Sequence, residues 1–197
     1  CLVITDSDQD GVDDVKDQFD QILLDMKIAH RDVDLALDGA DAIPSLTSFD
    51  RVILLMPSLD GLGTHLSDIM SWVSAGGSLM LAMPPDNSSY LQVIASKLGI
   101  ESAGYDYVKA ESIVPSEDFM LGGGERYELS DPFDSSLSVS LRETAREWAK
   151  TGDAGAPLIW SNDCGSGRTV VCNIGIYDKV MRGFFAAAIS LLGDATA

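Results

Sequence analysis

Apolar residues along the chain switch between two spacings, and the switch predicts strands followed by helices. Uninterrupted apolar runs at 1–4, 52–56 and 79–83 are typical of parallel strands that are covered on both faces. Between them, apolar residues recur every three or four positions over 15–26 and 62–73, which is the spacing of an amphipathic helix. Alternation over 28–36 predicts one further strand. The chain therefore reads as an α/β protein with a parallel sheet.

The second half of the chain does not show this alternation of strand and helix patterns. Residues 101–157 predict short, largely antiparallel strands, with a helical turn or two over 142–150. Residues 156–175 predict a hairpin that turns at Gly165-Ser166-Gly167. We therefore expect a single α/β domain over 1–197, with 101–157 as an inserted β-rich excursion.

A final amphipathic helix is predicted after this hairpin. Asp178 precedes the apolar positions and is of a residue type that caps helix N-termini. The buried face of this helix is expected to consist of Met181, Phe184, Phe185, Ala188 and Leu192.

The charge balance excludes several partners. The 197 residues include 31 Asp and Glu against 13 Lys and Arg, a net charge of -18, which repels nucleic-acid phosphates and anionic lipid. No apolar run approaches the roughly 18 residues of a membrane span, so we expect no membrane contact by this stretch itself. Because residue 1 already lies in a predicted strand, we expect one domain of a longer protein. Three cysteines make no disulfide framework.

The acidic stretch at 6–17, DSDQDGVDDVKD, has two interpretations. Its alternating aspartates have the register of a calcium loop, with Gly11 at the sharp turn. Alternatively, it is a metal-free turn from a strand into a helix whose N-terminus favours nearby aspartates. The chain would then need no cofactor. The calcium ligands in the first interpretation are Asp6, Asp8, Asp10, Val12, Asp14 and Asp17.

A second candidate site follows from topology. In an open parallel α/β sheet, ligands bind beyond the carboxyl ends of the strands. Polar side chains that could hydrogen-bond a sugar or another neutral ligand are expected there, although helix capping would account for several of them equally. These residues are Ser7, Ser58, Asp86 and Asn87, joined from the hairpin by Asn162 or Asn173.

The three tryptophans form a third group of candidates. A helical turn would expose Trp148, and an exposed tryptophan ring could stack on a sugar. Partial burial is the commoner fate of tryptophan and is the interpretation we favour for Trp72, Trp148 and Trp160.

Two stretches resemble a known family. Residues 49–84 contain a strand, a helix that ends in VSAGG and a second strand, and residues 157–175 form the hairpin PLIW…GSGRTVVCNIG. Both resemble class I glutamine-amidotransferase-like domains, which implies a three-layer, flavodoxin-like fold. The chain also resembles an uncharacterised bacterial family in which such a domain precedes a polysaccharide-deacetylase-like domain. That resemblance implies an extracytoplasmic or membrane-anchored parent protein, with a carbohydrate or the deacetylase-like domain as partner.

The chain departs from this family at the nucleophile. Active amidotransferases place a cysteine in a tight G-x-C-x-G turn beside a histidine, whereas the corresponding turns here are MPSLDG (56–61) and AMPPDN (82–87). Cys164 falls in the hairpin turn, and the two histidines are His30 and His65. We therefore expect a non-catalytic domain that binds a ligand or partner, or positions a neighbouring enzyme. Two alternatives are a hydrolase or amidotransferase relative with an atypical site at the strand ends and a calcium-stabilised extracellular module.

Overall fold

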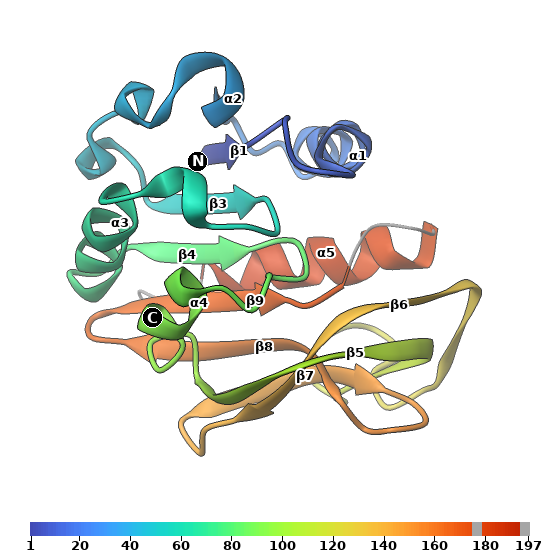
Figure 1. Cartoon of the computed structure of the whole chain (residues 1–197). Coiled ribbons are helices and arrows are strands. Elements are labelled where there is room, and N and C mark those ends of the chain that lie inside the picture. The colour runs from blue at the N-terminus through green and yellow to red at the C-terminus, as the bar shows by residue number, and fades with distance from the viewer. Residues whose placement is uncertain (175–178, 194–197) are drawn as a thin grey trace.

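Over residues 1–174 and 179–193, which the computed structural model describes, the chain forms one sheet of nine strands (Figure 1). The strand order is β2-β1-β3-β4-β9-β8-β7-β5-β6. The first five in this order run parallel, and the others extend the sheet through antiparallel pairs. The predicted flavodoxin-like α/β fold with an antiparallel extension is confirmed. The parallel strands are β1 (Leu2–Thr5), β2 (Arg31–Asp34), β3 (Arg51–Leu55), β4 (Ser78–Leu81) and β9 (Gly167–Cys172). The antiparallel strands are β5 (Ile100–Pro115), β6 (Tyr127–Leu141), β7 (Ala145–Thr151) and β8 (Pro157–Cys164).

Helices cover both faces of the sheet. On one face pack α1 (Val12–Asp25) and α5 (Lys179–Leu191), and on the other pack α3 (His65–Ser74) and α4 (Ser89–Ile94). The rings of Phe19 and Phe185 meet edge to face between α1 and α5, with centroids 5.7 Å apart. The remaining helical elements are α2 (Leu35–Asp38) and the 3₁₀ turns η1 (Ala40–Ala42), η2 (Leu46–Ser48) and η3 (Asp60–Leu62).

The apolar strands are uninterrupted because each one supplies two cores. Val3 and Ile53 pack under α1 and α5, whereas their neighbours Ile4 and Leu54 pack under α3. Side chains alternate between the two faces of a strand, so a strand that is covered on both faces is apolar at most of its positions. The predicted inner face of α5 is likewise buried, from Met181 to Leu192. The predicted cap Asp178 lies outside the described residues.

Two predictions for the β-rich half are wrong. Most of the predicted helical turn at 142–150 belongs to strand β7, because pairing with β5 and β8 outweighs the helix propensity of its sequence. The strands are also longer than predicted, since β5 has 16 residues and β6 has 15. Among the helices of the described residues, none combines the length and apolar character that a membrane crossing needs.

The exposure of Trp148 expected from a helical turn is also wrong. Its side chain lies in the core that includes α5, only 8% exposed, and its indole Nε1 donates a hydrogen bond to Ser161 Oγ at 2.8 Å. The guanidinium of Arg146 covers the ring at 3.9 Å from its centroid. Trp72 is partly buried, as the favoured interpretation expected, and Trp160 is fully buried.

Candidate functional site

The sheet brings four of the predicted ligand-binding residues to one edge. Because β1, β3 and β4 are parallel, the segments that follow them emerge together. Ser7 follows β1, Ser58 follows β3, and Asp86 and Asn87 follow β4. The backbone N–H of Asp86 donates to the carbonyl of Pro57 at 3.0 Å, so the last two segments are in direct contact.

Gln9 joins the segments after β1 and β3. Its Nε2 donates to Asp6 Oδ2 at 2.8 Å and to the Ser58 carbonyl at 3.0 Å, while its Oε1 accepts from the Ser58 N–H at 2.8 Å. Gly61 also lies close, since a Cβ there would be 3.0 Å from Asp6 Oδ2. Sequence reasoning missed Gln9, whose only signal was its place in the turn after a buried strand.

Asp34 connects the segment after β1 to the segment after β2, as Gln9 connects those after β1 and β3. One carboxylate oxygen accepts hydrogen bonds from the N–H groups of Ser7 and Ala36 at 3.0 and 3.1 Å. Partial burial acts to raise the pKa of Asp34, but the Ser7 side chain, together with the N–H groups of Ser7 and Ala36, stabilises its charged form more strongly and lowers the pKa. Sequence reasoning missed Asp34 too, although a polar residue that ends a strand and begins a helix is a recognisable cap.

We expect an Asp34→Asn substitution to lower the free energy of unfolding only at pH values at which the native Asp34 carboxyl is charged. The asparagine Oδ1 keeps both acceptor bonds, so only the charge is lost. Because the pKa of folded Asp34 lies below its ordinary value of 3.8, the charge contributes to stability above that value. The contribution disappears as the pH falls through the lower folded-state pKa.

Urea unfolding of both proteins at neutral pH and at about pH 3 measures this difference. An Asp50→Asn variant, altered at an exposed carboxylate before β3, is the matched control. A deficit of Asp34→Asn that stays constant between the two pH values would contradict the assignment.

The segment after β4 is held against the antiparallel extension. Asn87 Nδ2 donates to the backbone carbonyl of Gly104 at 3.0 Å, and its Oδ1 accepts from Gln92. Asp86 is exposed, and its pKa is raised by partial desolvation and by repulsion from Asp60. Asp86 is therefore a solvent-exposed carboxyl group that lies near a second exposed acid, Asp60.

The two hairpin asparagines lie elsewhere. Asn173 follows β9 at the same end of the sheet, but it is fully buried and bonds to both backbone groups of Leu137. Asn162 lies on β8 and pairs with Thr169 near the start of β9, which places it toward the opposite edge. There its Nδ2 donates to the Lys97 carbonyl at 3.0 Å. Neither residue extends the group formed by Ser7, Ser58, Asp86 and Asn87.

The acidic stretch forms a turn and the start of a helix. Helix α1 begins at Val12, directly after Gly11, whose φ of 76° lies in the left-handed region that favours glycine. Three of the proposed calcium ligands, Val12, Asp14 and Asp17, therefore belong to the helix, and the Val12 side chain is buried. Asp8 and Asp10 are exposed in the turn. Calcium binding by this stretch stays a prediction.

Comparison with protein families matches residues 1–148 to the family described as an uncharacterised protein conserved in bacteria, DUF2194. The chain belongs to this DUF2194 family. No curated protein matches it.

Solved structures show how widely the DUF2194 fold occurs. The cytoplasmic protein STM1381 from Salmonella typhimurium LT2 has a TM-score of 0.71 at 14% identity, over 97% of this chain and 98% of that one. A ThuA-like protein from Parabacteroides merdae has a TM-score of 0.63 at 14% identity, over 99% and 89%. The β-galactosidase from Bacillus circulans sp. alkalophilus has a TM-score of 0.65 at 15% identity, over 98% and 31%. These likenesses establish the fold, and the chain spans about a third of the length of the glycosidases it matches.

The cysteines and histidines of this DUF2194 chain form no hydrogen-bonded pair among the described residues, although Cys1 lies beside His30, where the Arg31 N–H donates to the Cys1 carbonyl at 3.0 Å. Cys164 and Cys172 are buried, and burial raises the pKa of Cys172 well above its ordinary range. Cys1 precedes β1 at the amino edge of the sheet. His65 opens α3, and His30 precedes β2. Within the described residues, which include all five, no hydrogen bond joins a cysteine to a histidine.

Proposed function

We propose that this chain is a non-catalytic domain that binds a neutral polar ligand or positions a neighbouring enzyme domain in an exported polysaccharide-modifying protein. One observation carries the proposal. At the carboxyl edge of the sheet, the side chains of Gln9, Asp34 and Asn87 are engaged with backbone groups of adjacent segments. Such side chains tie segments together and offer no nucleophile with an adjacent base.

Cysteine chemistry at this edge is disfavoured for a further reason. Cys172 ends β9, but it is fully buried in the core, and its raised pKa keeps it as a thiol. The thiolate is the reactive form of cysteine, and reactive cysteines are partly exposed. A hydrolase or amidotransferase relative with an atypical site would have to use Ser58 or Ser7. The carboxylate beside Ser7 is that of Asp34, whose lowered pKa makes it a weak general base, so we rank that alternative second.

The similar solved structures favour a role for this domain as the non-catalytic neighbour of a larger enzyme domain. Nearly the whole chain matches an exo-β-1,4-mannosidase and β-galactosidases, yet it spans only about a third of each. The fold therefore occurs as one portion of longer proteins whose names describe action on sugars. We extend this to the DUF2194 parent protein, with an extracytoplasmic or membrane-anchored location and a deacetylase-like neighbour as parts of the proposal.

The charges at the edge favour a neutral, hydroxyl-rich ligand. Asp34 ends strand β2, and Asp6, Asp60 and Asp86 lie on the segments that follow β1, β3 and β4. Their combined field repels anions, whereas carboxylate oxygens accept hydrogen bonds from sugar hydroxyls. We therefore propose a neutral polysaccharide as the ligand.

Affinity electrophoresis through gels containing galactomannan or β-1,4-glucan tests this ligand class. We expect the chain to be retarded by at least one neutral polysaccharide, and a Ser58→Ala, Asp86→Asn variant to lose most of the retardation. Asp50→Asn, altered at the opposite edge of the sheet, is the control for charge and should migrate like the wild type in the polysaccharide gel. Retardation that persists in the double variant, or hydrolysis of glutamine by the wild-type chain, would refute the proposal.

Calcium binding by the acidic stretch is a second candidate function. The favouring observation is that Asp8 and Asp10 are exposed together in the turn beside Asp6. We expect the thermal unfolding midpoint to rise by several degrees in millimolar calcium relative to EDTA, because a ligand that binds only the native state stabilises it. An Asp8→Ala, Asp10→Ala variant should lose the rise. Equal shifts with magnesium at matched ionic strength would indicate charge screening instead.

A further inference from the structure

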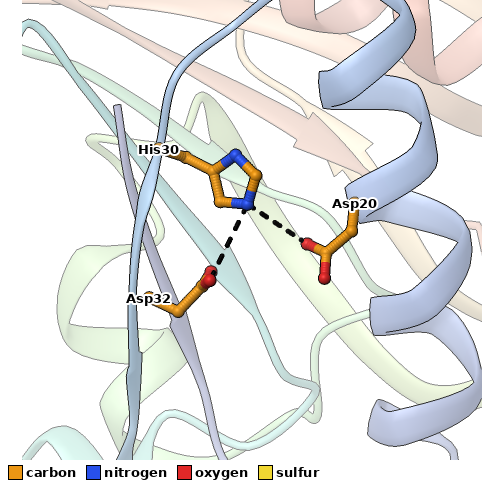
Figure 2. Close-up of side chains that lie close together, drawn as sticks. All are labelled: Asp20, His30 and Asp32. Atoms are coloured by element: carbon orange, nitrogen blue, oxygen red, sulfur yellow. Dashed lines mark ion pairs between the residues drawn. The ribbon is translucent and has the colours of Figure 1, made fainter.

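Three potential metal ligands converge at the opposite end of the first strands. Asp20 comes from α1, His30 from the segment after α1, and Asp32 from β2 (Figure 2). One ligand atom from each lies within 4.8 Å of the others, and within the described residues this is the one group of three or more such side chains that does so. The register of β2, in which Arg31 pairs with Leu2 at the start of β1, places the group away from the carboxyl edge.

The separations between these atoms suit a shared cation. His30 Nε2 lies 3.5 Å from Asp20 Oδ1 and 3.7 Å from Asp32 Oδ2. Both distances exceed those of well-formed hydrogen bonds. Two ligands of a tetrahedral zinc ion, each about 2.0–2.2 Å from the metal, are separated by roughly 3.3–3.5 Å. An ion between the three atoms would therefore require small movements of these side chains and the displacement of the Lys16 ammonium group, which contacts both carboxylates.

The backbone orients the imidazole for this role. His30 Nδ1 lies 3.4 Å from the carbonyl of Ile28, which is a long hydrogen-bond contact. When Nδ1 donates its proton to that carbonyl, the lone pair of the neutral ring is on Nε2, which faces both carboxylates. Metal-binding histidines characteristically donate their second ring N–H in this way.

Lys16 supplies positive charge to the carboxylates in the absence of a metal. Its Nζ lies 2.6 Å from Asp20 and 3.2 Å from Asp32. Burial acts to lower the pKa of Lys16, but the bonds to both carboxylates outweigh it and raise the pKa. An incoming cation must therefore compete with a charged ammonium group for the same two carboxylates.

We propose that Asp20, His30 and Asp32 form a site for a divalent transition-metal ion of the zinc class, which links α1 to β2. One imidazole nitrogen and two carboxylate oxygens suit zinc, whereas calcium and magnesium prefer oxygen ligands alone. Asp32 is exposed, so water can complete the coordination. This site is independent of the ligand and calcium sites proposed above.

Calorimetric titration of the metal-free chain with zinc chloride tests the proposal. We expect one ion per chain and a rise of several degrees in the unfolding midpoint on zinc addition. His30→Gln and Asp20→Asn should each weaken binding at least roughly tenfold, because each removes a ligand. Lys16→Met should strengthen zinc binding, because it removes the competing cation while it removes no ligand.

These substitutions are expected to change the zinc affinity in opposite directions, and this difference distinguishes a metal site from an ion-pair network. A purely structural network would predict no zinc binding in the wild type and no gain in Lys16→Met. An Asp25→Asn variant, altered at an exposed acid of the same helix, should bind zinc like the wild type. Zinc binding that survives His30→Gln or Asp20→Asn at wild-type strength, or that is lost in an Asp8→Ala, Asp10→Ala variant, would overturn the assignment.

Discussion

Replacing Gly167 with alanine is expected to destabilise the fold by more than about 3 kcal/mol. The tip of the β8–β9 hairpin lies against the end of α3, where the Ser166 N–H donates to the Ser74 carbonyl at 3.0 Å. A Cβ on Gly167 would overlap the backbone carbonyl oxygens of Val73 and Gly77. Because both oxygens belong to backbone that is fixed by α3 and β4, neither can move aside as a flexible side chain would.

Chemical denaturation of Gly167→Ala, with Gly104→Ala as its matched control, measures this effect. Gly104 also lies in a strand, but a Cβ there would meet Ser138 Cβ at 3.5 Å, an ordinary contact. We expect the control to lose or gain less than about 1 kcal/mol. Similar losses in both variants would show that the hairpin tip can withdraw from α3.

Replacing Asn173 with alanine should cost roughly 3–5 kcal/mol of unfolding free energy. Asn173 is fully buried, and its side chain accepts from the Leu137 N–H at 2.8 Å and donates to the Leu137 carbonyl at 2.7 Å. Truncation would leave both backbone groups of β6 without these partners, in a place where Leu137 itself is buried. The loss should appear as a lower urea midpoint.

The matched control for Asn173→Ala is Asn87→Ala. Asn87 Nδ2 also donates to a backbone carbonyl, that of Gly104, but its side chain is only partly buried. Water can replace its bonds, so we expect a loss of about 1 kcal/mol or less. Equal losses in the two variants would mean that β6 relaxes to satisfy its own backbone groups.

The parallel half of the fold was predictable because its signal is local. Runs such as 52–56 are apolar at every position, which strands covered on two faces require, and the helix spacings between them are unbroken. The positions of Ser7, Ser58 and Asp86 at one edge followed from that topology alone. The strand conformation around Trp148 could not be predicted in the same way. Its segment has the composition of a helix and is held as a strand by pairing with β5 and β8.

The candidate sites show the same division between local and distant information. The sequence by itself determined the order of elements in the parallel half, the parallel sheet and the acidic turn before α1, since all of these depend on neighbouring residues. Only the tertiary structure decided that Asn173 hydrogen-bonds to the backbone of β6 and that Gln9 joins the segments after β1 and β3. The same is true of the close approach of Asp20, His30 and Asp32. Those contacts depend on strand register and on how α1 packs beside β2, and no spacing along the chain encodes the distance between side chains on separate elements.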